Sequence, residues 1–318
     1  MATAQTLAQM NLLATSEVVA GVVDEIINAD PVIRRIPFVT GFDGTVYTYK
    51  RESTLPSGAF YEVEEVLPRG NPVFTSHDVT IKQYGLDSDL PGLYVTKENV
   101  NAQRAVNLIK TMKGVMENLG SHMVYANSTV ASQFDGLHSL VPTAQTTNEG
   151  SSSTGDELSL SNVDITIDLV RSGGIDHMVA NRTLLRRITE LVRFGWSNGP
   201  MRFSTDSFGD RIMDYMGYPI DKSDKVLFTE TIASGTFSAS TGGVTTSLFM
   251  LQYGLPASTK PGIFGISDTG MPQIRPNQPV DGKDVVRDRI VWYLALGLGG
   301  TKTVAVIDGI TDAAVEAA

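Results

Sequence analysis

Four residues between positions 87 and 98 have the types and spacing of a calcium-binding loop. In the run DSDLPGLYVTKE, carboxylates and a glycine fall at positions 1, 3, 6 and 12 of an EF-hand: Asp87, Asp89, Gly92 and Glu98. Position 5 is Pro91, which has no side-chain oxygen to offer the ion. An EF-hand also needs a helix before the loop, whereas the preceding residues alternate like a strand. We therefore expect a turn that leads into a helix, and we predict no metal site.

Glycines near the end of the chain have some features of a dinucleotide-binding loop. Gly297, Gly299 and Gly300 follow an apolar run, but the third glycine of G-x-G-x-x-G would fall at Lys302, and the chain then continues as another apolar run. Thr301 stands where a phosphate-binding loop needs a glycine before its lysine. A tight turn between two strands is the better interpretation, and no cofactor is predicted.

The remaining candidates for catalysis are one serine near glycines and four histidines. Residues 265–270 (GISDTG) miss the G-x-S-x-G spacing of a nucleophile elbow. The histidines are scattered, without a pair at metal-ligand spacing, and are expected to be surface or packing residues: His77, His122, His138 and His177. We predict that the protein is not an enzyme and has no catalytic, cofactor-binding or metal-binding residues. A hydrolase or sugar-binding enzyme within 151–318 is the alternative from another functional class.

Composition limits the class of protein further. The chain has 318 residues, of which 42% are hydrophobic, enough for two domains or one elaborate domain with a sizeable core. It has no cysteine, which excludes disulfides, thiolate–zinc sites and cysteine nucleophiles. The start lacks the features of a signal peptide, and no segment approaches the ~18 apolar residues of a membrane span, so we expect a soluble cytosolic chain. The net charge of −10 argues against direct reading of nucleic acid.

The segment 50–65 (KRESTLPSGAFYEVEEV) lies between two strand-like runs, 44–50 and 73–83. Hairpin loops usually have about 2 to 5 residues, so a connection of this length is unusual in a compact domain. The sequence predicts a long two-stranded arm with too little apolar surface to form a core of its own.

Before this arm, residues 16–29 have the apolar spacing of a helix that begins at Ser16. Pro31 is expected to end the helix, and residues 31–38 (PVIRRIPF) are expected to be extended.

After the arm, a long helix is predicted from Glu98 to Ala126. Apolar residues recur along it at spacings of three and four: Ala102, Ala105, Val106, Ile109, Met112, Met116, Leu119, Met123 and Ala126. Gly114 and Gly120 each weaken such a helix by about 1 kcal/mol, so packing along its length must hold it. An aspartate at either Ile109 or Met116 is expected to prevent folding, because both positions are predicted to face the core.

The second half of the chain begins with a polar stretch of low complexity, 141–157, which is predicted to be a loop or domain junction. Residues 161–174 are predicted to be a helix with Ser161 at its N-cap and a glycine stop. A strand at 175–180 follows, and then a helix that Asn181 opens. Its apolar face is expected to hold Leu184, Leu185, Ile188, Leu191 and Val192. This order indicates a small α/β layer.

From residue 226 onward short strands and glycine-rich turns dominate, and two apolar strands, 289–300 and 301–310, end the pattern. Four arginines lie on the helix after Asn181, where they form a solvated face or pair with acidic residues of a neighbouring subunit: Arg182, Arg186, Arg187 and Arg193.

This order of parts resembles the major capsid proteins of tailed bacteriophages, whose Hong Kong 97-type fold is shared with encapsulins. The resemblance is also local. Residues 19–38 and 47–56, with Tyr-x-Tyr and Arg-Glu ahead of the arm, are similar to the opening of one phage subgroup. Residues 124–141 resemble that subgroup's link ending in Phe-Asp-Gly-Leu, with a departure at Ala126-Asn127-Ser128.

The resemblance implies an α+β Hong Kong 97-type capsid fold with an N-arm, an E-loop hairpin, a long spine helix in a P-domain and a mixed α/β A-domain. The implied limits are 1–43 for the N-terminal arm, 44–86 for the E-loop hairpin, 87–150 for the P-domain with its spine helix at 98–126, 151–274 for the A-domain, 275–295 for the return to the P-domain and 296–318 for the C-terminal A-domain strand and tail.

The resemblance also implies a function. The protein would be a structural head protein that assembles into pentamers and hexamers of an icosahedral shell enclosing double-stranded phage DNA, formed in the host bacterial cytoplasm and found in the virion. Its partners would be copies of itself, contacted through the E-loop and N-arm, a portal, a separate scaffolding protein and a decoration protein. It would meet DNA without sequence-specific contact and would not meet a membrane. An encapsulin-like compartment shell is the alternative. Some family members crosslink covalently through a lysine and an asparagine. Lys50 and Lys82 flank the base of the E-loop and Arg69 lies nearer its tip, but none of these positions is assigned as a reacting lysine, and we predict no crosslinking.

Overall fold

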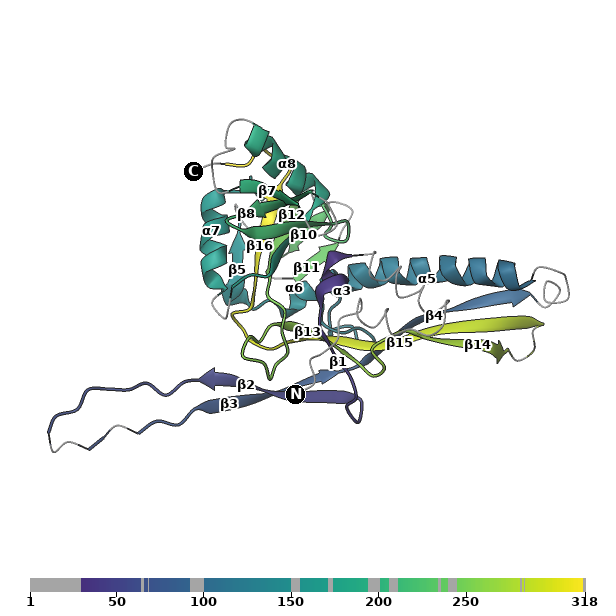
Figure 1. Cartoon of the computed structure of the whole chain (residues 1–318), viewed down its shortest axis with the longest axis horizontal. Helices are drawn as coiled ribbons and strands as arrows, with labels where there is room; N and C mark the ends of the chain where they lie inside the picture. Colours follow the sequence, from purple (N-terminus) through teal and green to yellow (C-terminus); the bar gives the residue numbers. More distant parts are fainter. Residues whose placement is uncertain are drawn as a thin grey trace.

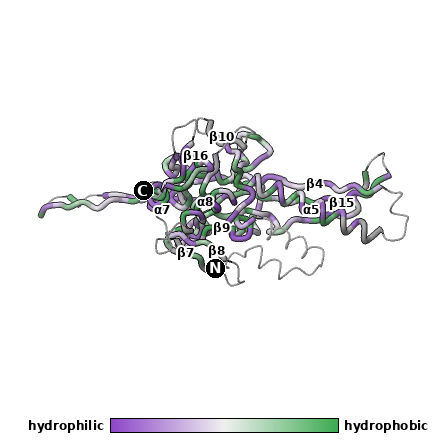
Figure 2. The backbone as a smooth tube through the Cα atoms, turned by 90° about the horizontal axis from the view of Figure 1, so that it is seen from above, coloured by the Kyte–Doolittle hydropathy of each residue, from purple (hydrophilic) through white to green (hydrophobic). Residues whose placement is uncertain are grey.

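The computed structural model describes the chain in the ranges 30–63, 66–67, 69–91, 100–149, 155–170, 174–193, 201–205, 211–233, 236–239, 245–280, 282 and 284–316. Within these ranges the strands form a five-stranded, a nine-stranded and a two-stranded sheet (Figure 1). The helix-covered nine-stranded sheet forms a compact lobe. The two-stranded ribbon and the five-stranded sheet extend from its base in opposite directions, as the view from above also shows (Figure 2).

The five-stranded sheet is built around one long strand. Its members are β1 (Phe38–Val39), β4 (Lys82–Pro91), β13 (Ile263–Ser267), β14 (Gln273–Pro279) and β15 (Val285–Leu298). Antiparallel pairing joins β15 to β4 on one side and to β13 and β14 on the other. Alternate residues of β15, such as Ile290, Trp292 and Leu294, are buried. This sheet therefore presents one apolar face that a helix must cover.

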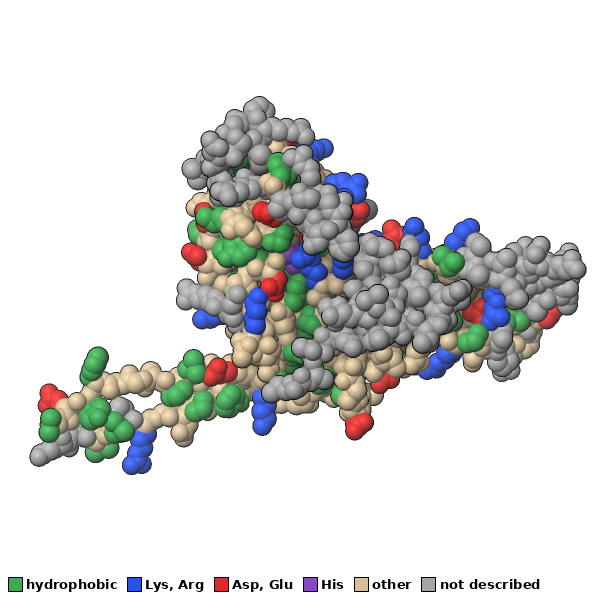
Figure 3. Space-filling view, viewed as in Figure 1, with side chains coloured by type: hydrophobic (Ala, Val, Ile, Leu, Met, Phe, Trp, Pro, Cys, Tyr) green, Lys and Arg blue, Asp and Glu red, His purple; other side chains and the backbone are tan. Residues whose placement is uncertain are grey.

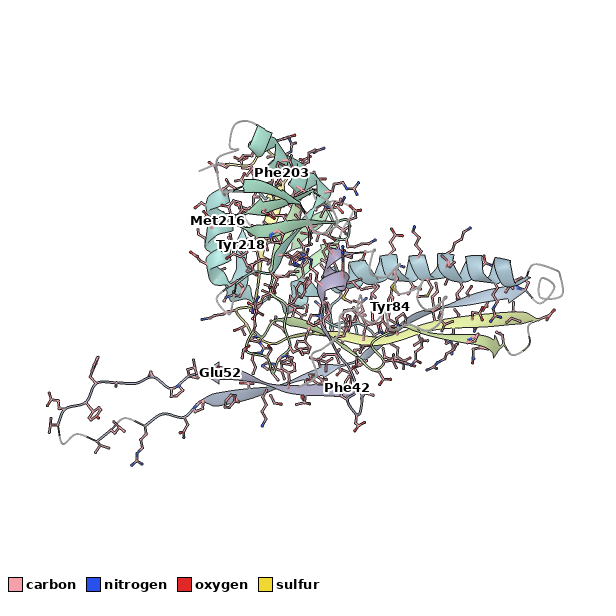
Figure 4. All side chains as sticks on the ribbon, viewed as in Figure 1. Phe42, Glu52, Tyr84, Phe203, Met216 and Tyr218 are labelled. Carbon is pink, nitrogen blue, oxygen red and sulfur yellow. The ribbon has the colours of Figure 1, made fainter. Side chains whose placement is uncertain are left out.

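Helix α5 (Val100–Tyr125) covers that face as the predicted long helix, and its 26 residues confirm the prediction. Tyr84 of β4 lies between the sheet and the helix (Figure 4), and its hydroxyl donates to the carbonyl of Val115 at 3.0 Å. Arg104 adds a bidentate ion pair with Asp288 of β15, with N–O distances of 2.6 and 2.5 Å. Burial of each large apolar side chain along the helix contributes roughly 1.5–3 kcal/mol.

The expected apolar stripe of α5 is correct at Met112, Met116, Leu119, Met123 and Ala126, which are all buried. It is wrong at Ile109, whose side chain is 57% exposed, whereas Leu108 and Val115 are buried instead. The stripe is centred on Leu108, Met112 and Val115, and Ile109 lies on its flank. Near the lobe this flank is covered, because the Lys225 stem lies against Gly120. Farther out, α5 projects beyond the lobe (Figure 1), and Ile109 is exposed there.

The link Phe-Asp-Gly-Leu folds the chain back under the end of α5. The N–H of Gly136 donates to the carbonyl of Ala126 at 2.8 Å. Asp135 accepts from the Ser128 N–H at 2.9 Å and from the Ser139 hydroxyl at 2.7 Å. Phe134 and Leu137 are buried beside it, and Leu137 begins the short helix α6 (Leu137–Leu140). The motif thus supplies two core side chains, one turn-forming carboxylate and one position of close backbone approach.

We predict that Gly136→Ala destabilises the protein by about 1–3 kcal/mol, because overpacked atoms here have no room to move. A Cβ at Gly136 would lie 2.8 to 2.9 Å from backbone atoms of His122, Val124 and Ala126. Gly114→Ala is the matched control, since a Cβ there would meet nothing within 4 Å. It should stabilise α5 by about 1 kcal/mol. Urea unfolding of both variants measures the difference, and equal effects at the two glycines would contradict the predicted packing.

The nine-stranded sheet is centred on β12 (Thr245–Leu251), which has β16 (Val304–Thr311) on one side and β6 (His177–Asn181) on the other. The remaining members are β5 (Thr146–Asn148), β7 (Met201–Thr205), β8 (Arg211–Tyr215), β9 (Tyr218–Ser223), β10 (Glu230–Ala233) and β11 (Thr236–Ala239). All seven residues of β12 are buried.

Two cores meet at this sheet. Phe249 and Leu251 of β12 belong to the core shared with α5, whereas Leu248 and Met250 belong to the core under the other helices, α7 (Leu160–Leu169) and α8 (Arg182–Arg193). The predicted strand at 175–180 and the helix after it are confirmed, and the Asn181 side chain accepts the Thr183 N–H at 2.8 Å.

Three local expectations were wrong, two of them in this half and one near the start of the chain. The stretch 141–157 is not all loop, because it contains a 3-10 turn (Thr143–Gln145) and β5, which pairs with β16 in parallel. Helix α7 begins two residues earlier than predicted, with Ser159 rather than Ser161 at the N-cap, and it ends at Leu169 before the glycines. Residues 31–38 are not simply extended, since α3 (Pro31–Arg35) forms there.

Helix α3 forms because Pro31 occupies a first-turn position and Asp30 caps it, accepting the Val32 N–H at 2.8 Å. Proline therefore begins a helix here. Val32, Ile33, Ile36 and Phe38 are buried in the core around α5. The predicted helix at 16–29 lies outside the described residues.

The two-stranded sheet is the predicted arm. Strands β2 (Val46–Thr54) and β3 (Val73–Thr80) pair antiparallel, with Val46 opposite Thr80 and Thr54 opposite Val73. The residues described between Thr54 and Val73 form no regular element.

Candidate functional site

The residues with calcium-loop spacing have a structural role. Asp87 and Asp89 lie on β4, where each forms a bidentate ion pair with an arginine of β15. Arg289 meets Asp87 at 2.8 and 3.0 Å, and Arg287 meets Asp89 at 2.6 and 2.8 Å. Hydrogen bonding to Arg289 holds the pKa of Asp87 below its usual range.

The expected turn at 87–91 is therefore wrong, because cross-strand pairing extends β4 to Pro91. Gly92 and Glu98 lie outside the described residues. In the part of the chain that the structure describes, no three His, Asp or Glu side chains are placed to hold a metal ion.

The glycine-rich end of β15 is the predicted turn between strands. The N–H of Gly299 donates to the carbonyl of Gly262 at 2.8 Å, and the Thr303 hydroxyl donates to the carbonyl of Gly300 at 2.7 Å. Ser267, the serine near glycines, is fully buried and accepts the indole N–H of Trp292 at 2.9 Å. These residues hold the end of the five-stranded sheet together.

All four histidines pack on aromatic rings, as expected for packing residues: His77 on Tyr49, His122 on Tyr84, His138 on Tyr125 and His177 on Tyr253. His177 is fully buried, and this burial lowers its pKa to about 3. It stays neutral near pH 7, and its Nε2 lies 3.4 Å from the Tyr253 hydroxyl.

The arginines of α8 pair within their own chain. Arg186 and Arg187 both contact Asp312, at 3.2 and 2.5 Å, and Arg182 contacts Asp224 at 3.2 Å. The side chain of Arg193 lies outside the described part. Contacts of these arginines with a neighbouring subunit stay a prediction.

The base of the arm is anchored by aromatic residues. The Tyr49 hydroxyl donates to the carbonyl of Leu298, the last residue of β15, at 2.7 Å. Tyr47 and Tyr49 both meet the ring of Phe264 edge to face, and Phe42 meets Tyr47 in the same way. These contacts fix the direction in which the arm leaves the body.

Beyond its base the arm exposes large apolar side chains. Nine of the fifteen large apolar side chains that are exposed in the described part belong to residues 46–74: Val46, Leu55, Phe60, Tyr61, Val63, Val66, Leu67, Val73 and Phe74. Phe60 and Val63 are 107% and 96% exposed, so none of the residues that the structure describes covers them. Figure 3 shows apolar side chains on both strands of the arm and around its tip.

This concentration marks the arm as the candidate functional site. A two-stranded ribbon alone is marginally stable in water, and clustered exposed apolar residues are typical of interaction surfaces. The arm was predicted from the sequence because its strands alternate without a partner. Its contacting residues were not singled out, although aromatic residues in a long, otherwise polar loop are a signal that could have found them.

Comparison with known proteins assigns the architecture. No protein-family model and no curated protein sequence matches the chain. Among solved structures, the encapsulin of the holo-SrpI complex from Synechococcus elongatus is 14% identical, with 99% of this chain and 98% of that chain covered and a TM-score of 0.67.

Phage-type capsids match in the same way. The capsid of a native GTA particle is 11% identical over 87% of this chain and 89% of that chain, with a TM-score of 0.58. A chain from Mycobacterium phage Bobi is 12% identical over 92% of both chains, with a TM-score of 0.55. The chain has the Hong Kong 97-type fold. At these identities the likeness establishes the fold alone.

Within the Hong Kong 97-type fold the parts can now be named. The E-loop is the hairpin 46–80, and the spine helix is α5. We call the five-stranded sheet with α5 the P-domain, and the nine-stranded sheet with α7 and α8 the A-domain. The predicted domain limits stay a prediction. Strand β4 begins at Lys82, inside the range predicted for the E-loop, and β15 runs past residue 295 to Leu298.

Proposed function

We propose that the protein is a structural, non-catalytic subunit of a closed shell, and specifically the major capsid protein of a tailed double-stranded DNA phage. It would assemble into pentamers and hexamers of an icosahedral head. The observation that carries this proposal is the E-loop, a projecting ribbon whose apolar side chains are left exposed by the described part of the chain.

A second copy of the same chain is the occupant that best fits the E-loop. The ribbon leaves the base of the A-domain in one direction and the P-domain leaves it in the other (Figure 2), so copies placed end to end would bring each ribbon alongside the next P-domain. Such a contact is heterologous, and heterologous contacts close into rings when the rotation permits. The apolar residues at the tip would then be buried only in the assembly.

The net charge of −10 supports a wall that encloses DNA without gripping it. Each phosphate captured by a lysine or arginine would strengthen sequence-independent binding and would retard DNA as it enters the head. We therefore propose contact with packaged DNA but no readout of its sequence. In the described residues no helix is long and apolar enough to cross a membrane.

An encapsulin-like compartment shell is the second candidate, favoured by the TM-score of 0.67 to an encapsulin against 0.58 and 0.55 to the two phage-type chains. The two candidates share one fold and one mode of assembly and differ in what is enclosed. For the phage candidate we also propose a portal, a separate scaffolding protein and a decoration protein as partners. Assembly in the bacterial cytoplasm, presence in the virion and the absence of covalent crosslinks belong to the same proposal.

The test is to express the chain alone and to examine it by negative-stain electron microscopy and light scattering. We expect closed particles, tubes, or discrete pentamers and hexamers. A monomer of 34.2 kDa at high concentration, unchanged by a candidate scaffolding protein, would contradict the shell proposal. Purified native particles that contain double-stranded DNA support the phage head, whereas particles that enclose a co-purifying enzyme support the compartment.

A further inference from the structure

Three carboxyl groups are buried together where the end of the spine helix meets the A-domain sheet. The residues Glu149, Glu230 and Asp308 are 3%, 1% and 2% exposed. They follow or lie on β5, β10 and β16, elements that are far apart in the sequence. In the described residues no lysine or arginine forms an ion pair with any of the three. Buried carboxyl groups without a cation are costly when ionised, so their protonation matters for stability.

Glu230 joins both domains. It accepts hydrogen bonds from the hydroxyls of Tyr125, at the end of α5, and Ser247, on β12. His138 of α6 places Nε2 3.3 Å from the same carboxylate. The Tyr125 hydroxyl in turn accepts the N–H of Leu227 at 2.7 Å. One carboxylate therefore links α5 and α6 to two strands of the A-domain.

Asp308 lies beside this link, on β16. With its nitrogen turned toward Asp308, the side-chain amide of Asn148 donates to both carboxyl oxygens. Burial, and then the charges of Glu230 and Glu149, raise the pKa of Asp308 to about 7. Asp308 therefore changes charge close to neutral pH.

Glu149 is the third carboxyl group, and its side chain contacts the start of α7. It accepts the N–H of Ser159 at 3.0 Å and the side-chain amide of Asn162 at 2.8 Å. Burial raises its pKa despite these bonds, and Asp156 and Glu316 raise it further. The charged groups that act on Asp308 are thus Glu149 after β5 and Glu230 on β10. Glu230 in turn contacts His138 on α6 and Tyr125 on α5.

We propose that this carboxyl cluster is a proton-dependent fastener, which holds the end of the spine helix against the A-domain most firmly when Asp308 is protonated. Ionised Asp308 adds a buried negative charge near Glu230 and Glu149. A buried carboxylate without a cation is costly, so ionisation favours an opening that lets water reach Asp308. Separation of α6 and the end of α5 from the sheet is the opening that we propose. The fastener belongs to the single chain, so it holds or fails independently of the proposed assembly.

The direction in which stability changes with pH follows from the difference between the folded and the unfolded pKa of Asp308. An unfolded aspartate has a pKa of 3.8, and the folded value is about 7, so the folded chain holds the extra proton between these limits. The contact of α6 and the end of α5 with the A-domain sheet is therefore most stable at acidic pH. Stability is lost as pH rises through this window and levels off above about pH 7.

The experiment is hydrogen exchange of the segments 137–149 and 226–233, with thermal unfolding, between pH 5 and 8. We expect the opening constant of these segments to rise by up to about tenfold per pH unit, after correction for intrinsic exchange, and to level off above pH 7. Asp308→Asn, which keeps the shape but cannot ionise, should flatten this dependence and should raise the melting temperature at pH 8 more than at pH 5. Asp268→Asn, at an exposed turn, is the control and should follow the wild type.

Equal pH dependence in the wild type and Asp308→Asn would overturn the proposal. If Asp308→Asn does not fold, Glu230→Gln provides the second test. It removes the charge that contributes most to the shift after burial, so the midpoint of the pH dependence should move to lower pH. An unchanged midpoint in that variant would also overturn the proposal.

Discussion

Replacing residues 55–72 with Asn-Gly is expected to abolish shell formation and to leave the rest of the protein folded. Thr54 and Val73 are directly opposed in the ribbon, so a two-residue turn can close the shortened hairpin without disturbing its base. The deleted residues contact nothing in the described core, whereas Tyr47 and Tyr49 keep the base attached. We expect a thermal transition within a few degrees of the wild type, but only monomers or small oligomers by light scattering and electron microscopy.

A length-preserving variant separates the shape of the E-loop from its chemistry. Phe60→Asp keeps the whole ribbon but places a charge where the side chain is 107% exposed. Folding should be unaffected, because the new carboxylate stays in water in the monomer. Assembly should be weakened, because contact with a neighbour would bury this carboxylate without a cation to pair with it. Normal shells from the Asn-Gly variant would refute the role of the E-loop. Normal shells from Phe60→Asp alone would show that Phe60 lies outside the contact.

Met116→Asp is expected to prevent folding altogether. The Met116 side chain is 1% exposed in the core between α5 and the five-stranded sheet, where no cation is available to a new carboxylate. Loss of the buried side chain costs about 2–5 kcal/mol. The buried charge costs several kcal/mol more. Together these are comparable with the 5–15 kcal/mol that stabilises a typical domain. Soluble yield, far-UV circular dichroism and a thermal melt report the outcome.

Ile109→Asp is the matched control on the same helix. Its side chain is 57% exposed, so the sequence-based expectation that this change also prevents folding is wrong. The variant should fold, with a change in stability within about 0.5 kcal/mol, as is usual for surface substitutions. Unfolded Ile109→Asp protein, or folded Met116→Asp protein, would place the core on the other side of the helix.

Periodicity explains which parts of the fold were predictable. The ribbon, α5, β6 and α8 each carry a strong two-residue or 3.6-residue pattern, and α8 also has its cap at Asn181. The errors came from tertiary contacts that no local pattern contains. Strand β4 continues to Pro91 because of Arg287 and Arg289, and β5 forms because it pairs with β16, about 160 residues away in sequence.

The sequence predicted that an arm of the protein binds a partner, but it did not predict which residues make the contact. A long ribbon without a core indicates a partner, and the order of parts pointed to a shell protein. The cluster of Glu149, Glu230 and Asp308 was not predictable, because three acids in unrelated segments carry no spacing signal. Only the strand order, which sets β16 beside both β5 and β12, brings Glu149 and Glu230 close to Asp308.

Strand β12 has a consequence for how the molecule responds to force and heat. Its side chains alternate between the core of the spine helix and the core of α7 and α8, and β16 beside it does the same with Val304 and Ala305. The two cores therefore share a wall of backbone hydrogen bonds, and neither can melt without exposing one face of that wall. A pull on the E-loop enters through Tyr49 at the end of β15, only a short turn before β16. A force applied to the E-loop would thus be carried into the shared wall, and complete unfolding of either core would expose one face of the other.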